Sequence, residues 1–451
     1  MNWERELIGA AVLAALFAMM VLVAELWARL AKPKPEWTRK LVHLGGGMAC
    51  LAFPFVIASP WTVLVMAVLL SGTFALGART GFLSSLHRVR RPTRGSEYYP
   101  LAIFVAYVLA YGRPWLYVSS VLTLSVADAF AALIGGRYGR LRYQVEDEQK
   151  SLEGSLAFLA IAFTAIWLPM VCMTDSPGWV CLLSALLVAV LVTGFEAISL
   201  RGSDNLFVPT AVCTILSKIT TKPLTEIIHQ NLSLAVICLG IGLLAWRTRV
   251  LNVGGAIVAI LFAYATWSLG SWQWALPVFL GLGTYLLAEV FAPVPVERLR
   301  RVRVGTMTRA LLSPFVLLVL ANAFGQYGLF FGPYMAAITT VLAFALWGFL
   351  RHRWPESGSE RLAGSMAACL CAILLVVLPL WLLQGLSAAS LVPVTGVTVA
   401  ACALDWLLTN VRKGDAPEII WGPCKVLLVF GAAATVIVLQ EFRLAPMWSP
   451  S

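Results

Sequence analysis

Asp128 is the residue of this chain whose position points most directly to chemistry. It stands inside the long apolar run LSVADAFAALIGG and precedes a loop rich in glycine and arginine. A carboxylate in hydrocarbon costs about 2.5–3.5 kcal/mol, so such a residue faces a partner, an ion or a water-filled cavity. At helical spacing its face is otherwise made of small residues, namely Ser125, Ala131, Ala132 and Gly135. This face leaves room for a ligand or for another helix.

A second candidate group lies in TRKLVHLGGG, where an expected helix at 41–57 leaves the membrane surface. Arg39 and His43 share a helix face there, and Lys40 flanks it. Cations in this position are suited to the phosphates of a nucleotide or a lipid. The same two cations could instead bind anionic headgroups, and His43 could be a hydrogen-bonded interior histidine.

The loop after Asp128 also has the composition of a phosphate site. It reads GGRYGRLRYQVEDEQKSLEG and contains Gly135, Gly136, Arg137, Lys150, Ser151, Glu153 and Gly154. Glycines let backbone N–H groups approach an anion, and a helix that begins near Ser151 directs its positive end toward it. Neither a Walker A loop nor a kinase glycine loop is present. Ser151 is equally suited to an N-cap, Glu153 to a first-turn carboxylate and Gly135 to close helix packing.

One further segment completes a ring of charge at the same membrane face. FEAISLRGSDNLFVP places Glu196, Arg201, Asp204 and Asn205 at the end of one expected helix and the start of the next. Phosphoryl or nucleotidyl transfer needs acids to hold Mg²⁺, cations to neutralise phosphates and a base near the attacking hydroxyl. The sequence offers all three kinds of group.

The elements that must position these residues are membrane helices. The chain has 451 residues, of which 60% are hydrophobic and 12% charged, so we expect an all-α, polytopic integral membrane protein. At about 20 residues per span we expect about 14–16 transmembrane helices. The sixteen candidate segments are 7–30, 41–57, 61–77, 99–112, 115–135, 154–173, 178–198, 205–219, 231–246, 253–268, 273–292, 310–325, 329–349, 365–385, 389–407 and 423–439.

The charge distribution predicts the orientation of these helices. The basic loops KPKPEWTRK, 79–94, 136–142, 247–249, ERLRRVR and RHRW all fall on one side, which the positive-inside rule makes cytoplasmic. The N-terminus is then external, and the first helix is expected to be retained, because no cleavage site precedes the next loop. This topology accounts for much of the net charge of +11, so we infer no nucleic-acid partner.

Four motifs occur together in an order that resembles a known family. They are TRKLVHLGGG, RGSEYYPLA, ADAFAALIGGRYGR with KSLEGSLAF, and FEAISLRGSDNLFVP. Over roughly residues 35–215 the chain resembles the phytol kinase and dolichol kinase family, which is related to the CDP-diacylglycerol synthases. The resemblance implies a CTP-dependent kinase that phosphorylates the hydroxyl of phytol, a polyprenol or diacylglycerol. It also implies an active site at the cytoplasmic membrane face.

The resemblance assigns roles to particular residues. The residues that the family requires correspond to Arg39, Lys40, Asp128 and Gly135. We expect Asp128 to bind Mg²⁺ or orient the hydroxyl, and Arg39, Lys40 and Lys150 to bind phosphates. The further metal candidates are Glu153, Glu196 and Asp204. The nucleotide contacts are expected from His43, Gly136, Arg137, Ser151, Gly154, Arg201 and Asn205.

The two halves of the chain differ in their content of polar residues. We expect a kinase-like catalytic domain at 1–230 and an additional polytopic region at 231–451, which is poorer in polar residues. Part of that second region, VLNVGGAIVAILFAYATWSLG, faintly resembles the phytyl-phosphate kinase family, but it contains no acid-rich motif. We therefore expect it to be a packing or lipid-binding extension.

Two other functions remain open from the sequence. A cytidylyltransferase would use the same nucleotide, although its usual closing motif, H-G-G followed by D-R-x-D, is replaced here by RGSDN. A secondary transporter would also have many helices, but transporters usually show repeated halves with midplane polar residues in both. Neither the acceptor alcohol nor the oligomeric state can be read from the sequence.

Overall fold

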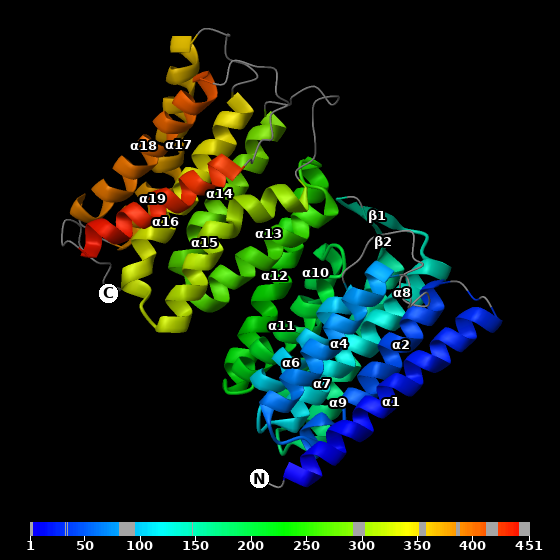
Figure 1. Ribbon diagram of the computed structural model, residues 1–451. Coiled ribbons are helices and arrows are strands. Elements are labelled where there is room, and N and C mark those ends of the chain that lie inside the picture. The colour runs from blue at the N-terminus through cyan, green and yellow to red at the C-terminus, as the bar shows by residue number, and fades with distance from the viewer. Residues whose placement is uncertain are drawn as a thin grey trace. The chain divides into compact units, whose positions relative to one another are not determined.

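The computed structural model describes residues 3–31, 33, 35–80, 95–146, 148–291, 303–350, 358–384, 388–411 and 423–441. Nearly all of these residues lie in helices (Figure 1). The chain separates into two compact units, residues 1–234 and residues 235–451. The division falls inside one helix, α12, close to the predicted boundary after residue 230.

The first unit is a bundle of helices with one small β-hairpin. Its elements are α1 (Trp3–Leu30), α2 (Pro35–Cys50), α3 (Phe53–Val56), α4 (Pro60–Thr80), α6 (Gly95–Leu109), α7 (Pro114–Leu122), the π-helix η1 (Thr123–Ala127), α8 (Asp128–Tyr138), β1 (Arg142–Val145), β2 (Glu148–Ser151), α9 (Leu152–Met173), α10 (Gly178–Ile198) and α11 (Asp204–Ile219). The first part of α12 (Leu224–Thr248), up to residue 234, also belongs to it.

The second unit is built around one helix that is apolar on all sides. Its elements are α13 (Val253–Ala265), the π-helix η2 (Thr266–Gly270), α14 (Trp272–Phe291), α15 (Val304–Phe324), α16 (Tyr327–Leu350), α17 (Gly358–Gln384), α18 (Ala388–Val411) and α19 (Pro423–Glu441). Helix α16 packs against α15, α17, α18 and α19, as expected for a helix without a polar face. A buried ion pair, Lys425 Nζ to Asp405 Oδ2 at 3.6 Å, joins α19 to α18.

The prediction of an all-α polytopic membrane protein is confirmed. Each of the sixteen candidate segments overlaps a helix, and α7, η1 and α8 run on as one span, Pro114–Tyr138. Within the described residues, twelve helices are long and apolar enough to cross a membrane by length and composition. Helices α2, α6 and α11 have 16, 15 and 16 residues, which is short for a full span.

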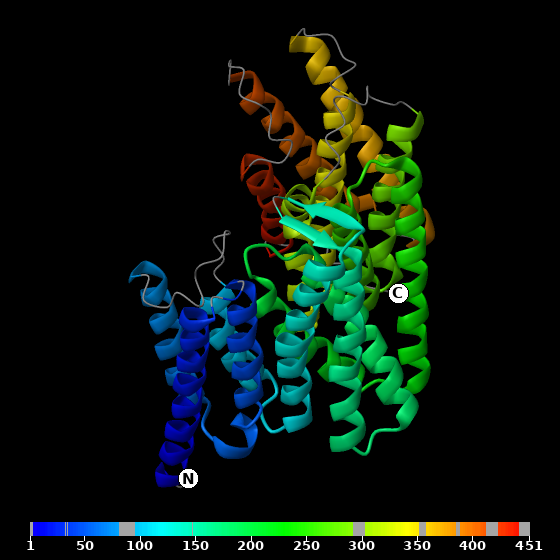
Figure 2. The same ribbon diagram turned by 90° about the vertical axis from the view of Figure 1, so that its right-hand side faces the viewer.

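The hairpin is the element that the sequence analysis did not anticipate. Strands β1 and β2 pair antiparallel, with Tyr143 opposite Lys150 and Arg142 opposite Ser151. Both strands have only four residues: β1 alternates exposed and less exposed residues, ending at the buried Val145, but so short a run inside a polar loop was not recognised as a strand. Figure 2 shows the hairpin at one end of the helices that precede and follow it.

Some of the basic loops used to predict orientation lie outside the described residues. These segments are 81–94, 292–302 and 351–357. The cytoplasmic orientation of the loops and the external N-terminus therefore remain predictions.

Candidate functional site

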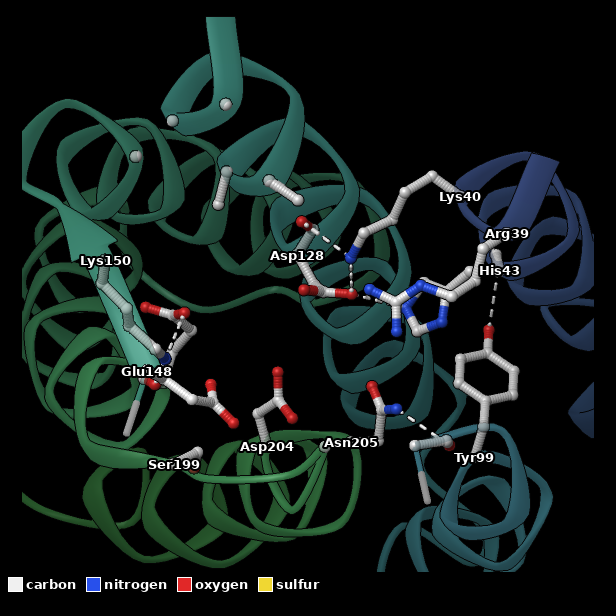
Figure 3. A pocket seen from close by; sticks show the side chains of 18 of the residues that line it. Arg39, Lys40, His43, Tyr99, Asp128, Glu148, Lys150, Ser199, Asp204 and Asn205 are labelled. Atoms are coloured by element: carbon white, nitrogen blue, oxygen red, sulfur yellow. Dashed lines mark hydrogen bonds and ion pairs between the residues drawn. The ribbon is translucent and has the colours of Figure 1, made fainter. Parts of the chain in front are cut away.

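A cavity of about 490 Å³ opens in the first unit where the hairpin meets the helix ends (Figure 3). Side chains from α1, α2, α4, α6, α8, α9, α10, α11 and the hairpin line it. Twelve of the predicted site residues contribute to the lining: Arg39, Lys40, His43, Asp128, Gly135, Gly136, Lys150, Ser151, Gly154, Glu196, Asp204 and Asn205. The fold thus gathers four separate sequence motifs around one space.

Asp128 is held by two groups from α2. Its Oδ2 atom lies 2.6 Å from Lys40 Nζ and 3.1 Å from His43 Nε2. The same His43 nitrogen lies 3.0 Å from the carbonyl oxygen of Leu124. Since both neighbours of Nε2 are acceptors, this nitrogen carries the ring proton. The carboxylate that appeared costly in the sequence is therefore charge-paired and hydrogen-bonded on the cavity wall.

A π-helix places Asp128 in this position. Residues 123–127 form η1, and Asp128 begins α8 directly after it. Short π-helical insertions occur frequently at functional sites, because the additional residue changes which side chains face the ligand. Nothing in the pattern of apolar residues indicated this widening, since the helix remains apolar throughout.

Tyr99, which the sequence analysis did not single out, supports His43. Its hydroxyl donates to the carbonyl oxygen of His43 at 3.1 Å and lies 2.7 Å from Ser125 Oγ. The two rings also pack together, with centroids 4.5 Å apart. Tyr99 is only 5% exposed, so its hydrogen bond to the His43 carbonyl is shielded from water and holds the α2 backbone in place there. The motif RGSEYYPLA contained this residue, but helical spacing gave no reason to prefer it.

Gly47 is required for this close approach of α2 to η1. A Cβ atom at Gly47 would lie 1.8 Å from Ser125 Oγ and 2.7 Å from the Tyr99 hydroxyl. A Cβ atom at Gly46 would similarly lie 3.0 Å from the ring of Phe17. The glycines of this motif therefore serve helix packing, whereas the sequence analysis interpreted similar glycines as space for an anion.

We expect Gly47→Ala to disturb the site through this contact. The added methyl group must displace Ser125 and Tyr99, and overpacking of this kind costs about 1–3 kcal/mol. Both the activity and the melting temperature of Gly47→Ala should therefore be lower than those of the unmodified chain. Gly72→Ala is the matched control, because a Cβ atom there meets no atom within 4 Å and the substitution favours the helix. If Gly47→Ala and Gly72→Ala had the same melting temperature and the same activity, the packing role of Gly47 would be contradicted.

Lys150 and Glu196 form the second charged pair of the cavity. Lys150 Nζ lies 2.8 Å from Glu196 Oε1 and also donates to the Glu196 carbonyl oxygen. Strand β2 alternates its side chains, which directs Lys150 inward from the hairpin. Burial by itself lowers the pKa of Lys150, but the Glu196 and Asp204 carboxylates outweigh it and raise the pKa above 10.5. Lys150 is therefore a fixed cation at neutral pH.

This pairing has a defined pH dependence. Since the pKa of Lys150 is raised in the folded protein, its stabilising effect is complete below the ordinary lysine value of 10.5. The effect is lost as the pH rises through the higher folded value. Titration of Lys150 itself therefore contributes no change of activity between pH 6 and about 9.

Glu148 and Asp204 supply two more carboxylates to the cavity. Figure 3 shows both side chains directed into the space that faces Asp128. Glu148 Oε1 accepts a hydrogen bond from the backbone N–H of Arg201 at 2.8 Å. Asn205, beside Asp204 on α11, donates to the carbonyl oxygen of Gly95 at 2.9 Å and so ties α11 to α6.

Two carboxylates of the cavity have the chemistry of magnesium ligands. Among the described residues, no group of three or more His, Cys, Asp or Glu is arranged to hold a metal ion. Mg²⁺ usually keeps several waters and binds through one or two carboxylates together with substrate phosphates. Asp204 and Glu148 meet that requirement.

The structure places three predicted residues outside the cavity lining. Glu153 accepts hydrogen bonds from the backbone N–H groups of Arg140 and Leu141, at 2.9 and 3.1 Å, and so anchors the loop before β1. The guanidinium of Arg137 lies over the Tyr138 ring. Arg201 contributes its backbone N–H to Glu148. These three side chains do not line the cavity, and their roles as metal ligand and nucleotide contacts stay predictions.

Two predicted ligand contacts have a packing role as well. Ser151 caps α9, since its Oγ accepts from the Gly154 N–H at 3.2 Å. A Cβ atom at Gly135 would lie 2.9 Å from Ser151 Oγ and 3.3 Å from the Gly154 Cα. The glycines thus allow α8 and α9 to approach closely. Ser151 is therefore an N-cap and Gly135 a close helix contact, which are the two structural roles that the sequence left open for them.

Several lining residues were not identified from the sequence. They are Ser96, Tyr99, Arg142, Glu148, Gln149 and Ser199. Three of them lie on the hairpin, so recognition of its two short strands would have revealed that alternate residues share a face.

The fold defines the class of this protein as a multi-pass membrane protein, and its first unit holds a cavity lined by paired carboxylates and cations. The chain is 34% identical over 206 residues to a phytol kinase of Synechocystis sp. (strain ATCC 27184 / PCC 6803 / Kazusa), which covers 45% of this chain and 87% of that protein. It is 30% identical over 138 residues to a Glycine max protein named probable phytol kinase 1, chloroplastic, over 28% of this chain and 45% of that protein.

The chain belongs to the phytol kinase family. In general terms it is therefore a lipid-alcohol kinase. No protein-family model matches the chain, and no solved structure matches it with significance.

Proposed function

We propose that this protein transfers the γ-phosphate of CTP to the hydroxyl of a long isoprenoid alcohol, with phytol as the first candidate. The observation that supports this best is the pairing of Asp128 with Lys40 and His43 on one wall of the cavity, opposite Lys150. Such an arrangement offers one oriented carboxylate and two fixed cations within a single space. The Synechocystis relative is named as a phytol kinase.

Asp128 has the central role in this proposal. The alcohol oxygen bonds to the γ-phosphorus while the bond from that phosphorus to the β–γ bridging oxygen breaks, and CDP leaves with the electron pair. The hydroxyl proton passes to Asp128, whose orientation is fixed by Lys40 and His43. Little covalent assistance is needed, because phosphoryl transfer depends mainly on position and on charge stabilisation.

The remaining charged residues bind the nucleotide. Arg39, Lys40 and Lys150 neutralise the phosphates, and Glu148 and Asp204 would hold Mg²⁺. Once bound, Mg²⁺ would supply positive charge that offsets the charge of the phosphates. Glu196 acts through Lys150, which it holds in place. This revises the expectation that Glu196 itself is a metal ligand.

We place this reaction at the cytoplasmic face of the membrane, with the N-terminus on the external side. The basic loops of the sequence support this orientation through the positive-inside rule. CTP is a cytoplasmic nucleotide and the alcohol resides in the bilayer, so a cavity at that surface is accessible to both.

The test is a donor and acceptor scan with the full chain in lipid nanodiscs. CTP, ATP and GTP are each supplied with phytol, a polyprenol or diacylglycerol, and phosphorylated lipid is measured. We expect CTP to be the best donor and an isoprenoid alcohol the best acceptor. If no pair yields a phosphorylated alcohol, the proposed function is wrong.

A further inference from the structure

A group of apolar side chains lines part of the cavity wall where the cavity meets the bundle. Phe17 of α1, Val42 of α2 and Phe74 of α4 line it there, together with Tyr99 of α6. Figure 3 shows the α2 and α6 side chains on the opposite side from Lys150. The wall opposite the hairpin, α10 and α11 therefore carries these apolar side chains beside the cations of α2.

A second, much smaller cavity continues from these apolar side chains. Its volume is about 10 Å³ and its surface is entirely apolar. It shares Phe17 and Tyr99 with the large cavity, so these two side chains form the partition between them. Its lining residues are Phe17, Cys50, Phe53, Val63, Met66, Ala67, Leu70, Tyr99, Pro100 and Ile103.

A single face of α4 connects the two cavities. Phe74 lines the large cavity, while Leu70, Ala67 and Val63 line the small one at successive helical turns. At 1.5 Å per residue this stripe is about 16 Å long. It therefore runs from the polar cavity along the helix into the apolar part of the bundle.

The helices that enclose this stripe are packed unequally. Helix α1 packs extensively on α2, whereas it contacts α4 at only a few positions. Phe17 is 4% exposed, and its ring lies directly against Gly46, where any larger residue would crowd it. A cavity of about 10 Å³ holds about one water molecule, so the passage is closed while Phe17 keeps this position.

We propose that the seam between α1, α4 and α6 binds the isoprenoid tail of the acceptor alcohol, with Phe17 as the gate that limits the accepted tail length. This inference rests on the proposed function. The hydroxyl must reach Asp128 in the polar cavity, while the tail must remain in an apolar environment. Phe17, Val42 and Phe74 give the cavity its apolar part, and Phe17 also lines the small apolar cavity beyond it. When the Phe17 ring turns aside, the two cavities join.

The first test compares acceptors of increasing length, namely geraniol, farnesol, phytol and a longer polyprenol. Phe17→Ala should raise kcat/KM for the polyprenol relative to geraniol about tenfold, because it removes the gate. Leu70→Trp fills the seam and should lower the ratio of phytol to geraniol about tenfold. Leu13→Ala is the control, because Leu13 is 3% exposed one turn from Phe17 on α1 and lines neither cavity. Its ratios should match the unmodified chain.

The second test locates the tail without turnover. A phytol analogue with a diazirine on its tail is photolysed with the full chain in nanodiscs, and labelled peptides are identified. We expect label on α1 and α4, reduced by excess phytol and by Leu70→Trp. Label confined to other helices would overturn the tail site. Unchanged length ratios in both Phe17→Ala and Leu70→Trp would also overturn it. If alcohols are still phosphorylated in these cases, the kinase function stands. If the chain phosphorylates no alcohol yet the label falls on α1 and α4, the kinase proposal fails and the tail site stands.

Discussion

Asp128→Asn removes phosphoryl transfer, with a loss of kcat of about 10²–10⁴-fold. The substitution keeps the size and shape of the side chain but removes the charge that Lys40 and His43 neutralise. Asparagine accepts no proton from the alcohol, and its amide group can present a donor where Lys40 and His43 already donate. The measurement is single-turnover formation of phosphorylated alcohol by the purified variant. The KM for the nucleotide should change much less than kcat.

Asp405→Asn is the matched control for this experiment. Asp405 is also a buried carboxylate paired with a lysine, Lys425 at 3.6 Å, but it belongs to the second unit. We expect its transfer rate to remain within about twofold of the unmodified chain. A fully active Asp128→Asn variant would refute the role of Asp128. A similar loss in both variants would show that the effect comes from a buried ion pair in general.

We expect Lys150→Met to lower both the free energy of unfolding and the rate of phosphoryl transfer, each by a large amount. The side chains of Lys150 and Glu196 are only 15% and 13% exposed. Removal of one partner from such a pair leaves an uncompensated charge, which costs about 3–5 kcal/mol. Activity should fall about 10²-fold or more, because the phosphates lose a fixed cation. Thermal unfolding and transfer rate are measured on the same preparation.

The double variant Lys150→Met with Glu196→Gln separates the two effects. Neutralising Glu196 removes the unpaired charge, so most of the lost melting temperature should return. The transfer rate should stay low, because the cation is still missing. If the rate returned together with the stability, Lys150 would be only a structural partner of Glu196.

The sequence predicted the helices and the polar residues of α2, α8 and α11 for a clear physical reason. Apolar runs of about 20 residues have few alternatives to a membrane helix. A charged residue inside such a run is costly enough to indicate a site by itself, which identified Asp128. The pairing of Asp128 with Lys40 could not be predicted from spacing, because the two residues are 88 positions apart and meet only through tertiary packing.

The features that the sequence missed depend on local backbone geometry. The π-helix at 123–127 leaves no trace in hydropathy, and the two strands of the hairpin have only four residues each. Without the hairpin, Glu148 appeared as one acid of an acidic run, and the contact of Glu153 with the backbone of Arg140 could not be foreseen. The glycines were ambiguous for the same reason, because close packing and an anion site both require a missing side chain.

The most direct test of the central claim follows the individual phosphates of CTP. The full chain in nanodiscs is given phytol with CTP radiolabelled at either the γ- or the α-phosphate, and the lipid and nucleotide products are separated. We predict that only the γ-label enters the lipid and that CDP is released in equal amount. Transfer of the α-label with release of pyrophosphate would identify a cytidylyltransferase and contradict the kinase mechanism.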